Sequence, residues 1–252
     1  MNPGVADDVA RILASLANLT VLSADHANIR VVDRLYSLPR TGKAVRIDKW
    51  RLDLPKQSLA DHLLTLGKLA DLFWDAAPPQ CDPRSLAVMI AFHDLAEVLV
   101  GDVPDFTTAD LAGTHFRTAE EKSIQEQWAN QRVLEALPDG LRLEAERALR
   151  ILADISNEQT RFFHMLDKIE PIISVWRYIS HHRETLDINA FLEAMSDFFT
   201  NPKVIGTCVN EEIRGLITHL QSKEAAQKFF INDQASDRLH ALLAQPMIMI
   251  QN

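Results

Sequence analysis

Two neighbouring side chains near the middle of the chain, His93 and Asp94, are suited to bind a metal ion. They lie in an apolar stretch, with Phe92 before them and Leu95 and Ala96 after them. Burying an imidazole and a carboxylate in such surroundings costs free energy unless the groups are paired or bind a cation. The pair therefore predicts a metal site.

Further ligands for the same ion can come from two other apolar segments. His62 lies near the start of a strongly periodic segment, and Asp167 is embedded among apolar side chains. If these helices pack beside the one that carries His93 and Asp94, two imidazoles and two carboxylates meet. Without thiolates, this set does not distinguish among Mn, Co, Ni, Fe, Zn and Mg. We predict one divalent cation, held by His62, His93, Asp94 and Asp167.

Two acidic residues that follow the pair are candidates for the chemistry. Glu97 comes four residues after His93 and three after Asp94, so on a continuous helix it shares their face. Gly101 is expected to end this helix, and Asp102 follows it directly. A cation with four protein ligands can keep positions for water and a phosphate oxygen, which favours hydrolysis of a phosphomonoester. We expect Glu97 to handle the proton.

The elements that must position these residues are predicted to be helices. The 252 residues include only eight glycines, and apolar side chains recur at three- and four-residue steps. The predicted helices cover residues 5–22, 25–36, 57–76, 83–99, 115–136, 139–153, 157–182, 188–199, 208–220 and 222–243. The sequence thus predicts an all-α bundle.

Breaks between these helices have chemical causes. Residues 78–79 and 138–140 contain proline or glycine and cannot continue a helix, while Asp82 can cap a helix that has Pro83 at its first position. Residues 38–55 lack a helical period and are predicted to form a long loop or a small hairpin.

Composition narrows the class of protein. The net charge of −9 argues against nucleic-acid binding, which needs a basic surface. Cys81 and Cys208 are too few for a disulfide framework, so we expect buried free thiols and a cytoplasmic location. No window is long and apolar enough for a membrane span. We expect one domain over residues 1–252, in which an apolar extension over about 185–245 covers the core or forms a homodimer interface.

The pattern H…HD…D that the four predicted ligands form is similar to the signature of the HD-domain metal-dependent phosphohydrolases. That resemblance implies an HD-domain helical bundle with additional N- and C-terminal helices. The match extends to Arg40-Thr41-Gly42, to the motif E-x-x-x-G-D-x-P that begins at Glu97, and to Leu166-Asp167-Lys168. These motifs resemble the bacterial 5′-deoxynucleotidase branch of the family, over about residues 20–180.

This resemblance implies hydrolysis of (deoxy)nucleoside 5′-monophosphates by a metal-activated water. It makes Asp102 a catalytic or substrate-orienting carboxylate beside Glu97. The guanidinium of Arg40 can bind phosphate oxygens in a bidentate manner, although Lys43 or Arg46 could take its place. The residues expected to contact the substrate are Arg40, Thr41, His62, Asp94, Asp102, Val103, Pro104 and Asp105.

Other functions remain open at this point. A deoxynucleoside triphosphate triphosphohydrolase needs more cationic residues, and residues 40–51 concentrate them at Arg40, Lys43, Arg46, Lys49 and Arg51. A mixed-valence di-iron oxygenase is known among relatives of this fold. From a different class, a non-catalytic nucleotide sensor could use the metal site for recognition alone.

Overall fold

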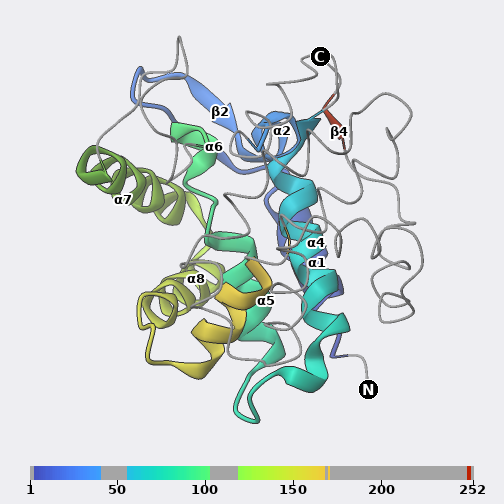
Figure 1. The fold of residues 1–252 in the computed structure, drawn as a ribbon. Coiled ribbons are helices and arrows are strands. Elements are labelled where there is room, and N and C mark those ends of the chain that lie inside the picture. Colours follow the sequence, from blue (N-terminus) through green and yellow to red (C-terminus); the bar gives the residue numbers. More distant parts are fainter. Residues whose placement is uncertain (1–2, 41–55, 103–118, 168–169, 171–248, 251–252) are drawn as a thin grey trace, which may run out of the picture.

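The computed structural model describes residues 3–40, 56–102, 119–167, 170 and 249–250. Within these residues the protein is built from helices, with two short antiparallel pairs of strands (Figure 1). The prediction of an all-α fold is confirmed. None of the described helices is long and apolar enough to cross a membrane.

Three helices form the centre of the described structure. Helix α1 (Val5–Ser15) packs against α4 (Leu59–Leu72) and α5 (Pro83–Phe92), and Figure 1 shows α1 running beside α4. Their contact faces are apolar at helical spacing, with Val9, Leu63 and Ile90 fully buried. Burial of these faces holds α4 and α5 in a fixed relation, and these two helices carry the candidate site.

Helices α1 and α4 approach closely at Gly67. A Cβ atom placed there would lie 3.0 Å from the Cα of Ala6 and 3.3 Å from a methyl group of Val9. At the end of α4, the carboxylate of Asp71 accepts hydrogen bonds from the backbone N–H groups of Val5 and Ala6, at 2.8 and 3.1 Å. Asp71 thus serves as the cap that the first turn of α1 lacks from its own chain segment.

Replacing Gly67 with alanine is expected to lower the free energy of unfolding by about 1 kcal/mol, because crowding against the Ala6 backbone exceeds the gain in helix propensity. Gly140 in α8 (Asp139–Leu152) is the matched control, since a Cβ atom placed at Gly140 would have nothing within 4 Å. Gly140→Ala should cause no loss. Urea unfolding followed by circular dichroism measures both, and equal effects at the two positions would contradict the close approach.

The N-terminal region differs from the predicted helices over 5–22 and 25–36. Helix α1 ends at Ser15, and β1 (Thr20–Leu22) then pairs antiparallel with β2 (Asn28–Arg30), which leads into α2 (Val31–Ser37). The turn between the strands has the N–H of His26 donating to the carbonyl of Ser23, with His26 at φ 63°. A left-handed histidine replaces the glycine that usually indicates such a turn, so the sequence pattern missed the hairpin.

The predicted helix over 83–99 is also interrupted. Helix α5 ends at Phe92, turns follow, and α6 (Glu97–Val100) begins at Glu97. The Nδ1 atom of His93 lies 2.9 Å from the carbonyl oxygen of Ile90, the acceptor that the Asp94 N–H would use in a continuous α-helix. The N–H of Glu97 instead donates to the carbonyl of Asp94, three residues earlier. The break therefore falls at the predicted metal ligands.

Other predicted breaks are found, although the one predicted over 138–140 lies at 137–138, because α8 begins at Asp139. Asp82 caps α5 by accepting from the N–H of Ser85, with Pro83 at the first position, and Gly101 ends α6 at φ 82°. The η1 turn (Trp74–Ala76) follows α4, and α7 (Ala119–Ala136) and α8 are separated at residues 137–138. Residues 158–167 and 170 are helical, in the first part of the predicted helix over 157–182.

A second strand pair joins distant parts of the chain: β3 (Lys56–Gln57) lies antiparallel to β4 (Met249–Ile250), with Gln57 opposite Met249. Residues 41–55, most of the predicted loop, lie outside the described residues. So do the predicted helices over 188–199, 208–220 and 222–243, and with them the whole predicted C-terminal extension over about 185–245. The single-domain organisation stays a prediction. Cys81 is a buried free thiol, as expected, and Cys208 lies outside the described part.

Candidate metal centre

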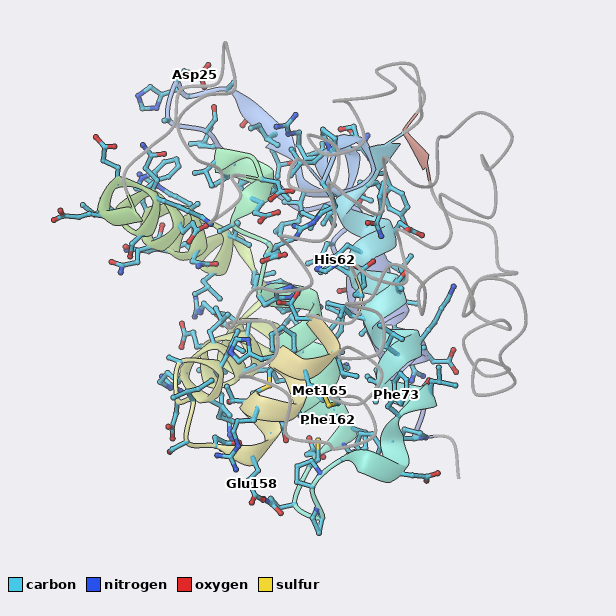
Figure 2. The ribbon with its side chains drawn as sticks, viewed as in Figure 1. Asp25, His62, Phe73, Glu158, Phe162 and Met165 are labelled. Atoms are coloured by element: carbon cyan, nitrogen blue, oxygen red, sulfur yellow. The ribbon has the colours of Figure 1, made fainter. Side chains whose placement is uncertain are left out.

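The first candidate ligand, His62, is positioned by the start of α4. Ser58 caps this helix, since its hydroxyl accepts from the N–H of Asp61 at 3.0 Å. His62 lies well inside the molecule, with 1% of its surface exposed (Figure 2). Its Nδ1 atom lies 2.8 Å from a carboxylate oxygen of Glu170. Because an ionised carboxylate only accepts, Nδ1 carries the proton and Nε2 presents a lone pair.

The second imidazole, His93, is oriented in the same way from the end of α5. Its Nδ1 donates to the carbonyl oxygen of Ile90, which leaves Nε2 with the lone pair. The ring of Phe163, from residues 158–167, contacts the His93 ring edge-on with centroids 4.8 Å apart. Both imidazoles therefore turn Nε2 toward each other, with these atoms 3.4 Å apart, and each Nε2 offers a lone pair when its ring is neutral.

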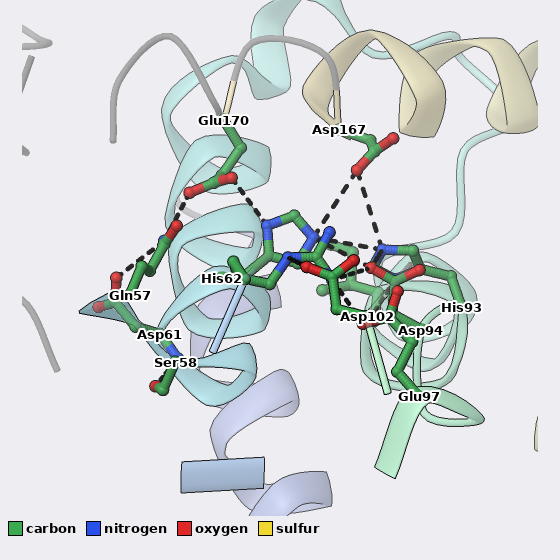
Figure 3. Close-up of polar contacts among 12 residues, drawn as sticks. Gln57, Ser58, Asp61, His62, His93, Asp94, Glu97, Asp102, Asp167 and Glu170 are labelled. Atoms are coloured by element: carbon green, nitrogen blue, oxygen red, sulfur yellow. Dashed lines mark hydrogen bonds and ion pairs between the residues drawn. The ribbon is translucent and has the colours of Figure 1, made fainter. Parts of the chain in front are cut away.

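Two carboxylates complete the cluster, which we call the metal cluster and define as His62, His93, Asp94 and Asp167 (Figure 3). An Asp94 oxygen lies 3.1 Å from Nε2 of His93 and 3.5 Å from Nε2 of His62. An Asp167 oxygen lies 3.9 and 3.7 Å from the same two atoms.

These spacings fit a divalent cation. Ligand atoms that are each about 2.1 Å from one ion, at angles of about 90–110°, lie about 3.0–3.5 Å from one another. The two Nε2 atoms lie 3.1 to 3.9 Å from each other and from the Asp94 and Asp167 oxygens, which is close to that range. The donor chemistry agrees, because both histidines offer a lone pair and both acids offer an oxygen.

A second group of charges adjoins the metal cluster. The Nη1 atom of Arg40 lies 2.9 Å from Oδ2 of Asp94 and 2.6 Å from Oε2 of Glu97, and its Nε is 3.7 Å from Oδ2 of Asp102. All four side chains are largely buried, and Arg40 is 15% exposed. We call Arg40, Glu97 and Asp102 the Arg40 cluster. Asp94 joins it to the metal cluster.

The electrostatics separate these acids. Burial alone would raise the pKa of Asp94, but the positive charges of His93, when its ring is protonated, and of Arg40 outweigh this effect and hold that pKa well below its usual range. Burial raises the pKa of Glu97 well above its usual range, and the negative charges of Asp94 and Asp102 add to this effect against the opposing charge of Arg40. Of Asp94 and Glu97, Glu97 is therefore the acid that holds a proton more readily.

The structure thus brings together seven of the residues that the sequence singled out, from four segments of the chain. They are Arg40, His62, His93, Asp94, Glu97, Asp102 and Asp167. One detail of the prediction was wrong: Glu97 reaches this group from the start of α6 and through Arg40, because the helix breaks after Phe92. Thr41, Val103, Pro104 and Asp105 lie outside the described residues, as do Lys43 and Arg46.

Three polar residues around His62 were not predicted from the sequence. Glu170 is fully buried beside the His62 ring. Gln57, which contacts both Glu170 and Asp61, is almost fully buried, and so is Asp61. A signal for Glu170 was present, because it follows Asp167 by three residues and so shares its side of a helix. No comparable signal existed for Gln57, which was predicted as the first residue of the helix over 57–76 but lies in strand β3.

Comparison with known proteins agrees with this geometry. The family model described as "HD domain" matches residues 33–204, more than half of the chain and all of the metal cluster. The chain belongs to the HD-domain family. This membership confirms the predicted helical bundle and the prediction of an HD-domain hydrolase.

Several curated proteins are similar over most of their length. Each carries the name 5'-deoxynucleotidase HDDC2. The mouse (Mus musculus) protein is 26% identical over 70% of this chain and 81% of its own length. The human (Homo sapiens) protein is 25% identical over 70% of this chain and 79% of its own. The zebrafish (Danio rerio) protein is 26% identical over 73% of this chain and 85% of its own length.

Proposed function

We propose that this HD-domain protein hydrolyses the phosphate ester of (deoxy)nucleoside 5′-monophosphates, using one divalent cation held by the metal cluster. The observation that carries the proposal is the convergence of two lone-pair-bearing imidazoles and two carboxylates from separate segments. The names of the curated relatives support the choice of substrate. A cation bound there supplies Lewis-acid polarisation of the phosphoryl group and a nucleophile derived from water.

The Arg40 cluster supplies the remaining groups. Glu97, whose raised pKa lets its carboxyl hold a proton, is proposed to move that proton during ester cleavage. Gly101, at φ 82°, turns the chain so that Asp102 faces back toward Arg40, where it can orient the substrate. Arg40 holds these acids beside Asp94, and we propose that its guanidinium also meets the entering phosphate.

The test is phosphate release from a panel of ribo- and deoxynucleoside 5′-monophosphates, by protein stripped with EDTA and reloaded with Mn²⁺ or Co²⁺. We expect release only with metal, and at least a tenfold loss in His93→Ala, because that change removes one lone pair from the cluster. The control is His26→Asn, an exposed histidine whose left-handed turn asparagine tolerates. The proposal fails if no metal gives phosphate release, or if the two variants behave alike.

The panel also separates the alternatives. Deoxynucleoside triphosphates are included, and release of tripolyphosphate or pyrophosphate would favour the triphosphohydrolase over our proposal. Metal and nucleotide binding without turnover would favour a sensor. A measured iron content near one atom per chain would count against the di-iron oxygenase. Homodimer formation, which stays a prediction, is measured by size in solution.

A further inference from the structure

Glu170 is the most deeply buried acid next to the metal cluster. Its side chain is 0% exposed, and Oε2 lies 2.8 Å from Nδ1 of His62, whose side chain is 1% exposed. Figure 3 shows Glu170 on one side of the His62 ring, with Asp167 and His93 on the other. Glu170 therefore contacts the ring nitrogen that faces away from the other ligands, and it is not itself part of the ligand set.

The carboxylate of Glu170 is held in place from its other oxygen. The amide nitrogen of Gln57 lies 2.8 Å from Oε1 of Glu170 and 2.9 Å from Oδ2 of Asp61. Gln57 is held by its backbone. It lies opposite Met249 in the β3–β4 pair, and its backbone carbonyl accepts a hydrogen bond from the N–H of Arg40 at 2.9 Å. Both oxygens of Glu170 are thus engaged, and the His62 ring has a rigid partner.

The two imidazoles of the cluster differ in this respect. His93 donates its Nδ1 proton to the neutral carbonyl of Ile90, whereas His62 donates to a carboxylate in a buried setting. A carboxylate partner fixes the tautomer and the ring orientation, and it makes the opposite nitrogen a stronger ligand. Such an interaction is stronger than one with a neutral acceptor.

We propose that Glu170 is a positioning residue that aims Nε2 of His62 at the cation and increases its affinity for metal, with Gln57 holding Glu170 in register. This inference rests on the metal site of the proposed function. It adds a buried acid, three residues beyond the ligand Asp167, as a determinant of metal affinity.

The test is a titration of EDTA-stripped protein with Co²⁺ alone, followed by its visible absorption spectrum. Replacing Glu170 with glutamine removes the charge but keeps the size and an acceptor, and Glu170→Ala removes both. We expect Co²⁺ affinity to fall by about 10-fold in the first variant and about 100-fold in the second, the range typical of outer ligand partners. The Co²⁺ bands should also shift.

Thr160→Val is the matched control. Thr160 is fully buried within the helical residues 158–167, and its hydroxyl donates to the carbonyl of Ile151 at 2.7 Å. This variant should lose thermal stability but keep wild-type Co²⁺ affinity and spectrum. The inference is overturned if both Glu170 variants bind Co²⁺ like the wild type, or if Thr160→Val weakens binding as much as they do.

These outcomes separate the inference from the function on which it rests. If the wild type and the Glu170 variants bind Co²⁺ equally and all hydrolyse nucleotides, only the role of Glu170 is lost. If the graded loss of Co²⁺ affinity is found without any phosphate release, the positioning role stands and the proposed hydrolysis fails. If the wild type binds no Co²⁺, both proposals fail.

Discussion

Replacing Asp94 with asparagine is expected to lower kcat/KM for a deoxynucleoside 5′-monophosphate by roughly 10²- to 10³-fold, the effect of losing one electrostatic stabiliser of a transition state. Asp94 connects the metal cluster to Arg40, because one of its oxygens lies within 3.5 Å of nitrogen atoms of His62, His93 and Arg40. Asparagine has nearly the same shape but no charge, so it is a poor ligand for a hard cation. Steady-state kinetics with saturating Co²⁺ measures the loss.

The control for this prediction is Asp71→Asn, the same chemical change on α4. Asp71 accepts hydrogen bonds from Val5 and Ala6, far from the metal cluster, so its variant should lose stability by about 1 kcal/mol as a helix cap does. Its activity should stay within about 2-fold of the wild type, since surface and capping changes leave a distant site intact. An Asp94→Asn protein that keeps more than a tenth of the wild-type activity would exclude Asp94 as a ligand.

Replacing Arg40 with methionine is expected to lower the free energy of unfolding by about 3–5 kcal/mol, measured by urea unfolding in EDTA. The Arg40 guanidinium faces the carboxyl groups of Asp94, Glu97 and Asp102. Burial by itself lowers the pKa of Arg40, but the negative charges of these acids outweigh burial and raise that pKa well above its usual value. Removing the Arg40 guanidinium leaves the buried carboxyl groups of Asp94, Glu97 and Asp102 without this positively charged partner. This loss exceeds the ordinary cost of a surface ion pair, about 0–1 kcal/mol.

Arg40→Lys tests whether charge or geometry matters. Lysine keeps the positive charge but lacks the planar guanidinium. In the wild type, Nη1 of that guanidinium contacts Asp94 and Glu97, and its Nε approaches Asp102. We expect its stability to lie between those of the wild type and Arg40→Met. If Arg40→Met unfolds at the wild-type urea concentration, the Arg40 cluster does not stabilise the fold.

The ligand residues are recognisable from the amino-acid sequence because their chemistry conflicts with their surroundings. His93 and Asp94 follow Phe92, and an unpaired polar pair in an apolar stretch requires a cation or a partner. Helix ends at Asp82, Pro83 and Gly101 were readable for a similar reason, since capping and left-handed turns depend on the local side chain or its absence.

Contacts between distant segments could not be read in the same way. Glu170 follows Asp167 by three residues, but nothing in the sequence indicates that Gln57 meets it near His62, because that approach depends on how distant segments pack against α4. The break after Phe92 likewise arises from a side chain, His93, that takes a backbone acceptor. Local propensity is encoded residue by residue, whereas such partnerships arise only when packing brings remote groups within hydrogen-bonding distance.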